Sequence, residues 1–95
     1  MTEEINEKVS VVSIYERDSL ERYKVKPFQF RWQGKKYIIE QVDYYHIRKT
    51  QLTRSSGYKK EHVYDVICGA MHYRLVCDPS NLHWKLEFID DGNTN

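Results

Sequence analysis

The chain has 95 residues, of which 40% are hydrophobic, 31% charged and 14% aromatic, with a formal net charge of +1. That length suffices for one domain with one core, and the composition is ordinary for a folded domain apart from an excess of aromatic residues, mostly tyrosine. The acidic start MTEEINEK is unlike a signal peptide, and no stretch reaches the ~20 apolar residues of a membrane span, so we expect a cytoplasmic protein. The two cysteines, Cys68 and Cys77, are too few for a disulfide framework and are expected to be reduced thiols.

The N-terminal quarter of the chain predicts one strand. Residues 1–8 are expected to be a ragged terminus, as are residues 91–95, which leaves a single β domain over residues 9–90. The β-branched run Val9–Tyr15 is typical of a strand, and residues 16–22 are expected to form a single helical turn.

The stretch FQFRWQGKKYII (residues 28–39) predicts a β-hairpin. Its first six residues alternate large apolar and polar side chains, as an antiparallel strand with one buried face requires. Gly34 can adopt the positive φ of a two-residue hairpin turn. The return strand is expected to run from Tyr37 to about Ile47, with a β-bulge near Glu40–Gln41 that reconciles its alternation.

Residues 62–68 and 71–77 predict a second hairpin, joined by a Gly69-Ala70 turn. Residues whose numbers sum to 139 then face each other. Asp65 therefore lies across from Arg74, and this opposite-charge pair favours the register.

A type I turn is expected at Asp78–Asn81, followed by a last strand. In the expected register of that strand, Trp84 pairs with Leu75 and His72 lies across from Glu87. The large apolar side chains are expected to form the core, and half exposure is the alternative for Trp32 and Trp84, which lie near turns; the set comprises Phe28, Phe30, Trp32, Tyr73, Trp84, Leu86 and Phe88.

Together these elements predict a mainly β fold. We expect an antiparallel meander of five or six strands, forming a curled sheet or a small barrel, with at most one short helix.

Several of these residues form a wider pattern: Phe30-x-Trp32-x-Gly34-x-x-Tyr37-x-Ile39-x-x-Val42, then Tyr73-x-Leu75, Asp78, Trp84-x-Leu86 and Asp90. The pattern resembles a family of small bacterial proteins known only as a domain of unknown function, over roughly residues 21–91. The shared residues are hydrophobic and turn residues, so the resemblance implies a fold much more than an activity. Some relatives are encoded beside error-prone DNA polymerase genes, which implies a link to DNA damage tolerance. The chain departs from the pattern at Tyr44-Tyr45-His46, where the family has an apolar residue and a tryptophan.

Charge is unevenly distributed along the chain. Residues 22–60 carry eleven Lys or Arg against two acids, whereas the two ends together carry four against twelve. The stretch 46–60 has five Lys or Arg, no acid and Tyr58, and such a loop can neutralise phosphates and stack a base. The alternative is a solvated loop that keeps the sheet soluble. If nucleic acid binds, we expect the contacts to come from Arg31, Lys35, Lys36, Arg48, Lys49, Arg54, Tyr58, Lys59 and Lys60.

Metal and catalytic signals are weak. His62 is expected to face Cys77, but Cys68 lies three pairs away along the same ladder, roughly 20 Å, too far to share an ion. Asp43 and His46 are expected on opposite faces of a strand, which disfavours an acid–base pair. Hydrolase and phosphate-loop motifs are absent from the sequence. We therefore expect no enzymatic activity, metal or cofactor.

The tyrosines outside the expected core point to an interface, because tyrosine commonly anchors protein partners. The candidates are Tyr15, Tyr23, Tyr44 and Tyr45. Exposed strand edges offer a second route to a partner, by addition of a strand. The sequence therefore favours a non-enzymatic interaction module that binds an unknown protein or a second copy of itself. The alternative is a nucleic-acid-binding accessory domain that uses residues 22–60.

Overall fold

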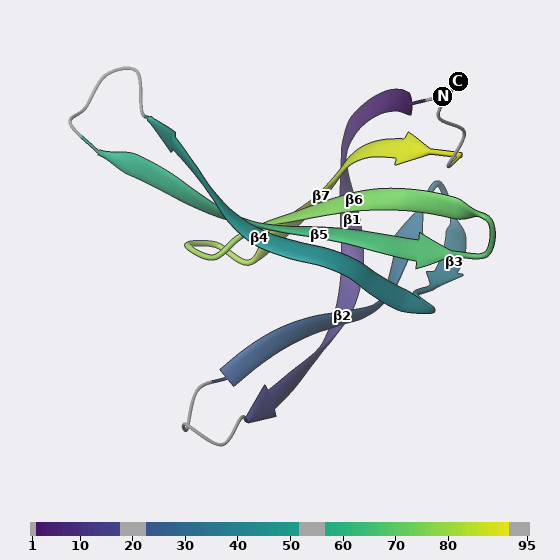
Figure 1. Ribbon diagram of the computed structural model, residues 1–95, viewed down its shortest axis with the longest axis horizontal. Coiled ribbons are helices and arrows are strands. Elements are labelled where there is room, and N and C mark those ends of the chain that lie inside the picture. The colour runs from purple at the N-terminus through teal and green to yellow at the C-terminus, as the bar shows by residue number, and fades with distance from the viewer. Residues whose placement is uncertain (1, 18–22, 52–56, 92–95) are drawn as a thin grey trace.

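The computed structural model describes residues 2–17, 23–51 and 57–91 and shows one antiparallel sheet of seven strands (Figure 1). The strands are β1 (Thr2–Arg17), β2 (Tyr23–Trp32), β3 (Lys35–Ile38), β4 (Gln41–Gln51), β5 (Tyr58–Cys68), β6 (Met71–Asp78) and β7 (His83–Asp90). The mainly β prediction is confirmed, with seven strands in place of five or six. The described residues include no helix that could cross a membrane.

The sheet consists of two meanders, and its strand order is β3-β2-β1-β7-β6-β5-β4. Pairing of β1 with β7 joins the meander β1–β3 to the meander β4–β7. β3 and β4 follow each other in the chain but lie at opposite edges of the sheet. Only Ile39 and Glu40 connect them: the Ile39 N–H donates to the Phe28 carbonyl at 3.0 Å, and the Glu40 N–H to the Ile67 carbonyl at 2.9 Å. The sheet therefore curls until its two edges meet at this linker, without closing into a barrel.

This linker corrects the prediction of one return strand from Tyr37 to Ile47. The irregularity at residues 39–41 is a strand break at which the chain crosses to the opposite edge, not a bulge. A bulge does occur shortly afterwards, between Val42 and Tyr44.

The N-terminal segment is also more ordered than expected. Residues 2–8, predicted to be ragged, pair with β7, beginning with Thr2 opposite Asp90. This pairing covers the edge of β7 and packs Ile5 and Val9 against the core. Residues 16 and 17 belong to β1 and not to a helical turn, and residues 18–22 lie outside the described part of the chain.

The first hairpin has the predicted turn. Gln33 and Gly34 have φ values of 52° and 74°, so both turn residues adopt the left-handed conformation of a type I′ turn. Phe30 is buried and stacks on Tyr37 across the hairpin, with a 4.8 Å ring separation. Phe28, however, is not in the core: it is the extra residue of a bulge, is 46% exposed, and leaves the buried position to Pro27.

The second hairpin has the predicted register, but β7 does not. Asp65 lies across from Arg74, as expected. β7 is displaced by two residues, because the loop before it includes Leu82 at a φ of 58°. A bulge at Glu87 then displaces it further, so that His72 faces Asp90.

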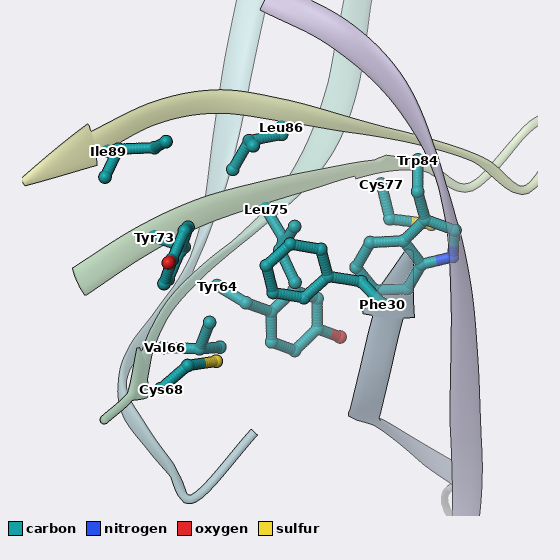
Figure 2. Packing of buried hydrophobic residues seen from close by; sticks show 10 residues of the cluster. All are labelled: Phe30, Tyr64, Val66, Cys68, Tyr73, Leu75, Cys77, Trp84, Leu86 and Ile89. Carbon is teal, nitrogen blue, oxygen red and sulfur yellow. The ribbon is translucent and has the colours of Figure 1, made fainter. Parts of the chain in front are cut away.

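This register changes which side chains are buried. Trp84 pairs with Cys77 and not with Leu75, but it is buried in the core, as expected. Phe88 lies on the outer face beside Arg74, and Ile89 takes its place in the core. The core fills the inner, concave face (Figure 2) and comprises Phe30, Tyr64, Val66, Cys68, Tyr73, Leu75, Cys77, Trp84, Leu86 and Ile89.

Candidate functional site

β4 is a long strand at the edge of the sheet. One side pairs with β5 along its length, and no described strand pairs with the other side. Its exposed side chains include large ones: Tyr44 is 58% exposed, Tyr45 44% and Ile47 51%. A long apolar edge with unpaired N–H and C=O groups is a template for another strand, and proteins usually blunt such edges.

The two tyrosines of β4 lie on opposite faces of the sheet. Tyr45 pairs with Tyr64 of the core and so lies on the inner face, whereas Tyr44 pairs with Asp65 on the outer face. The Tyr45 hydroxyl is hydrogen-bonded to His62 Nδ1 at 2.6 Å, and its ring packs against Tyr64 at 4.8 Å. Burial raises the pKa of the Tyr45 hydroxyl, so it remains neutral. The edge therefore has one aromatic ring on each face: Tyr45, fixed by these contacts, on the inner face, and the more exposed Tyr44 on the outer face.

The opposite edge of the sheet is blunted. Its edge strand, β3, has only four residues, of which two are lysines. β3 covers only residues 29–32 of β2, so β2 has a second unpaired stretch before Gln29. That stretch contains Pro27, which has no N–H to donate, and the bulge at Phe28. Between the middle of β2 and the start of β4 lies an open hollow of about 480 Å³. From there the β1–β2 and β4–β5 arms diverge (Figure 1).

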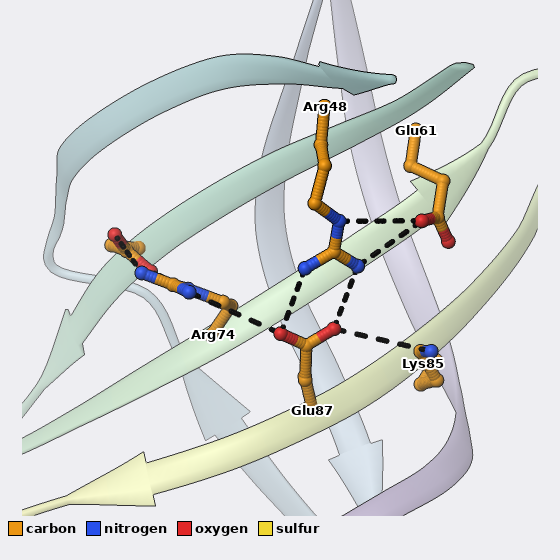
Figure 3. Close-up of polar contacts among 6 residues, drawn as sticks. Arg48, Glu61, Arg74, Lys85 and Glu87 are labelled. Carbon is orange, nitrogen blue, oxygen red and sulfur yellow. Dashed lines mark hydrogen bonds and ion pairs between the residues drawn. The ribbon is translucent and has the colours of Figure 1, made fainter. Parts of the chain in front are cut away.

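An ionic network on the outer face holds β4 in place (Figure 3). Arg48 bonds Glu61 of β5 at 3.1 Å and reaches across two strands to Glu87 of β7 at 2.8 Å. Val63 and Val76 pair on the same face and are fully buried, so the outer face also has a second, small apolar layer. The hydrogen bond to Glu87 raises the pKa of Arg48, and that bond lowers the pKa of Glu87.

The predicted basic contacts do not form one surface. Arg31, Lys35 and Lys36 lie on the β2–β3 hairpin, at the opposite end of the sheet from the tip of the β4–β5 arm (Figure 1). Lys35 lies 5.3 Å from the Tyr37 ring centre. The supposed loop is mostly strand, because β4 extends to Gln51 and β5 begins at Tyr58.

Within the β4–β5 arm, only some of the predicted basic side chains are free to contact a nucleic acid. Arg48 is neutralised by Glu61 and Glu87, and Lys59 bonds Asp78 at 3.3 Å. Lys49 and Lys60 lie opposite each other and are exposed, as is Tyr58. Arg54 lies outside the described residues.

The remaining tyrosine candidates lie elsewhere. Tyr15 pairs with Val25, and Tyr23 with Arg17, on the β1–β2 arm. That arm diverges from β4 (Figure 1), so the four predicted interface tyrosines do not gather at one place.

The titratable groups do not favour catalysis. His62 faces Cys77, as predicted, and both line a hollow of about 80 Å³, too small for an ordinary ligand. Burial raises the pKa of Cys77, and it raises the pKa of Cys68 to about 11, so both thiols are protonated and weakly nucleophilic. Among the described residues, no group of three or more His, Cys, Asp or Glu side chains is arranged to hold a metal ion.

The sequence pointed to Tyr44 and Tyr45 as interface residues but did not show that they lie on an edge strand. The edge position of β4 depends on the strand break at Ile39–Glu40, and the broken alternation there was its only local signal. Ile47 was also overlooked as a surface residue.

Comparison with known proteins adds no family: no family model, curated protein or solved structure matches the chain. The resemblance to a family of small bacterial proteins therefore stays a prediction.

Proposed function

We propose that this protein is a non-enzymatic interaction module whose edge strand β4 binds a strand of a partner. The observation that carries the proposal is the combination of an eleven-residue edge strand with three large exposed side chains. In strand addition, main-chain hydrogen bonds supply affinity and alternate side chains supply specificity. Tyr45 and Ile47 would contact the added strand on the inner face, and Tyr44 on the outer face.

The rigidity of β4 supports this proposal. A strand that is already extended loses little conformational entropy when a partner pairs with it. β4 is extended by its pairing with β5 and is held by the bonds of Arg48 and Tyr45. The edge of β2, in contrast, contains a proline and a bulge.

The test uses a labelled peptide with a stretch of alternating valine and threonine that is as long as β4, eleven residues. Lysines flank this stretch at both ends. We expect saturable binding by fluorescence anisotropy that changes little with salt. Ile47→Lys should weaken it at least about tenfold, because a charge at an edge opposes strand addition. The matched control is Ile38→Lys, since Ile38 is 47% exposed but lies on the opposite edge strand, β3. Absence of binding, or equal effects of the two variants, would contradict the proposal.

The alternative function is nucleic-acid binding, with the link to DNA damage tolerance that the resemblance implies. The observation that favours it is the exposed Lys49–Lys60 pair, because like charges side by side are unfavourable without an anion. Anisotropy of labelled single- and double-stranded DNA and RNA tests it at low and physiological salt. Phosphate binding should fall steeply with salt and should be lost in Lys49→Glu/Lys60→Glu. Arg48 and Lys59 are unsuitable for this test, since both form ion pairs within the fold.

A further inference from the structure

We propose that the outer face of the first meander, β1–β3, binds an acidic amphipathic helix of a partner protein. This face is separate from the edge of β4, so the inference does not rest on the proposed function. The face carries a row of apolar side chains with cations on both sides of it. The matching partner presents a stripe of apolar side chains with acids on both borders.

A row of partly exposed side chains crosses the three strands of this face. Ile38 of β3 pairs with Gln29 of β2, and Gln29 pairs with Val12 of β1. The next pair along the hairpin, Phe30 and Tyr37, packs in the core on the inner face, so the side chains of the row point outward. Val12 is 52% exposed and Ile38 47%.

Ile14 extends this apolar surface along β1. The bulge at Phe28 adds a residue to β2 only, so the side chains of β1 alternate regularly between the two faces from Val12 to Ile14. Ser13, between them, lines the inner hollow with Trp84, and Ile14 is 43% exposed on the outer face. The outer face of β1 and β3 thus carries three β-branched aliphatic side chains, each about half exposed.

Cations border this apolar surface on both sides. On one side Arg31 pairs with Lys36, and on the other Lys26 pairs with Ile14. All three cations are exposed, and none forms an ion pair with a residue that the structure describes. β2 and β3 contain no Asp or Glu. Like charges directly opposite each other, as in the Arg31–Lys36 pair, destabilise a sheet, and an acidic partner would neutralise them.

The dimensions of the row fit one helix. A strand adds to the edge of a sheet, whereas the face of a sheet is covered by a helix or a second sheet. The row spans two strand spacings, roughly 10 Å, which matches the ~10–12 Å diameter of one α-helix. An apolar stripe on the helix would cover Ile38 and Val12, and acids on its borders would reach the cations.

Other occupants fit this face less well. The Gln29 side chain, at the centre of the row, has no hydrogen-bond partner among the described residues, so a bilayer would leave its amide unpaired, whereas a helix side chain can bond it. Aliphatic side chains cannot stack on bases as aromatic rings do. A second copy would bring Arg31 and Lys36 against the same cations, because a two-fold interface joins identical patches.

A synthetic helix tests this inference on the full chain. The labelled peptide is about five turns long, with leucines at helical spacing in one stripe, glutamates on both borders of the stripe and alanines elsewhere. Fluorescence anisotropy should show saturable binding. A second peptide with lysines in place of the glutamates should bind at least about tenfold more weakly, because the face is cationic.

Arg31→Glu separates binding from folding. The substitution turns a like-charge pair with Lys36 into a pair of opposite charges, so thermal unfolding should show no loss of stability. Peptide binding should weaken at least about tenfold, because an acid then faces the glutamates of the helix. The matched control is Lys49→Glu, which makes the same change of charge in the exposed Lys49–Lys60 pair and should leave binding unchanged.

Ile38→Gln tests the apolar row and should weaken binding at least about threefold, because apolar contact area is lost. Its control is Ile47→Gln on β4, where the side chain is exposed to a similar extent. Absence of saturable binding, equal effects of Arg31→Glu and Lys49→Glu, or no effect of Ile38→Gln would overturn the inference. Phosphatidylserine vesicles or duplex DNA that bind in place of the peptide, with loss of that binding in Arg31→Glu, would assign the face to a membrane or a nucleic acid and overturn it as well.

Discussion

Replacement of Arg48 by methionine should destabilise the protein more than an ordinary surface substitution does. The guanidinium bonds Glu61 and Glu87, whose side chains are only 11% and 16% exposed. Arg48→Met keeps an unbranched hydrophobic side chain but leaves two poorly solvated carboxylates without their main counter-charge. The destabilisation therefore comes from the uncompensated acids more than from the lost attraction.

The magnitude follows from the exposure of the network. Breaking a fully buried ion pair costs about 3–5 kcal/mol. Arg48 is 32% exposed, and Glu87 keeps Arg74 and Lys85 at 3.9 Å, so part of that cost is screened. We expect a loss of about 2 kcal/mol, which lowers Tm by about 8–16 °C for a domain of this size.

Urea unfolding followed by tryptophan fluorescence measures the loss, with Arg31→Met as the control for an exposed arginine. The loss of stability in the double variant Arg48→Met/Glu87→Gln should be far smaller than the sum of the losses in the two single variants, because the two residues act as one pair. The penalty of Arg48→Met should also shrink with acid. In the wild type the pKa of Glu87 is lowered, so its stabilising contribution is full above about pH 4.3 and is lost as pH falls through the folded value. A penalty below about 0.5 kcal/mol at pH 7, or one that does not change with pH, would refute this reasoning.

Two other measurements address the turn and the thiols. Gly34→Ala should cost about 1–2 kcal/mol in urea unfolding, because a Cβ there meets no atom within 4 Å and the cost is the left-handed φ of 74° alone; a stability equal to wild type would contradict the turn geometry. Cys68 and Cys77 should react slowly with iodoacetamide at pH 8 and rapidly in denaturant, since burial raises the pKa of Cys68 to about 11 and both thiols are buried. Mass spectrometry would contradict this if either cysteine of the native protein reacted as fast as a free thiol.

The parts of the fold that were predictable are those set by neighbours in sequence. The Gln33-Gly34 turn and the Asp65–Arg74 register depend on residues a few positions apart, and both are as expected. The predicted register of β7 was wrong, because leucine rarely adopts a positive φ and the sequence therefore did not indicate one at Leu82. With Leu82 read as the first residue of the strand, the expected pairing shifted by two, and Trp84 was set opposite Leu75 and not opposite Cys77.

The candidate site was predictable only in its residue types. Tyr44 and Tyr45 are exposed, but their position at a sheet edge depends on which strand the chain pairs with after Ile39. That pairing is set by tertiary contacts and not by the local sequence. Arg48 illustrates the same limit. Its main partner, Glu87, is 39 residues away, so a basic stretch gave no sign that this charge is used inside the fold.

The pairing of β1 with β7 has a consequence for the folding pathway. Thr2 and Asp90 are partners, so this seam closes a loop of nearly the whole chain. Relative to a tight hairpin, loop closure there costs about 3 kcal/mol more entropy, so the seam should form last, after β1–β3 and β4–β7 have formed as separate meanders. The seam is also interrupted between Glu4 and Glu7, where Asn6 has a φ of 53°. Native-state hydrogen exchange should therefore resolve two cooperative units, with the amides of the seam exchanging before those between β5 and β6.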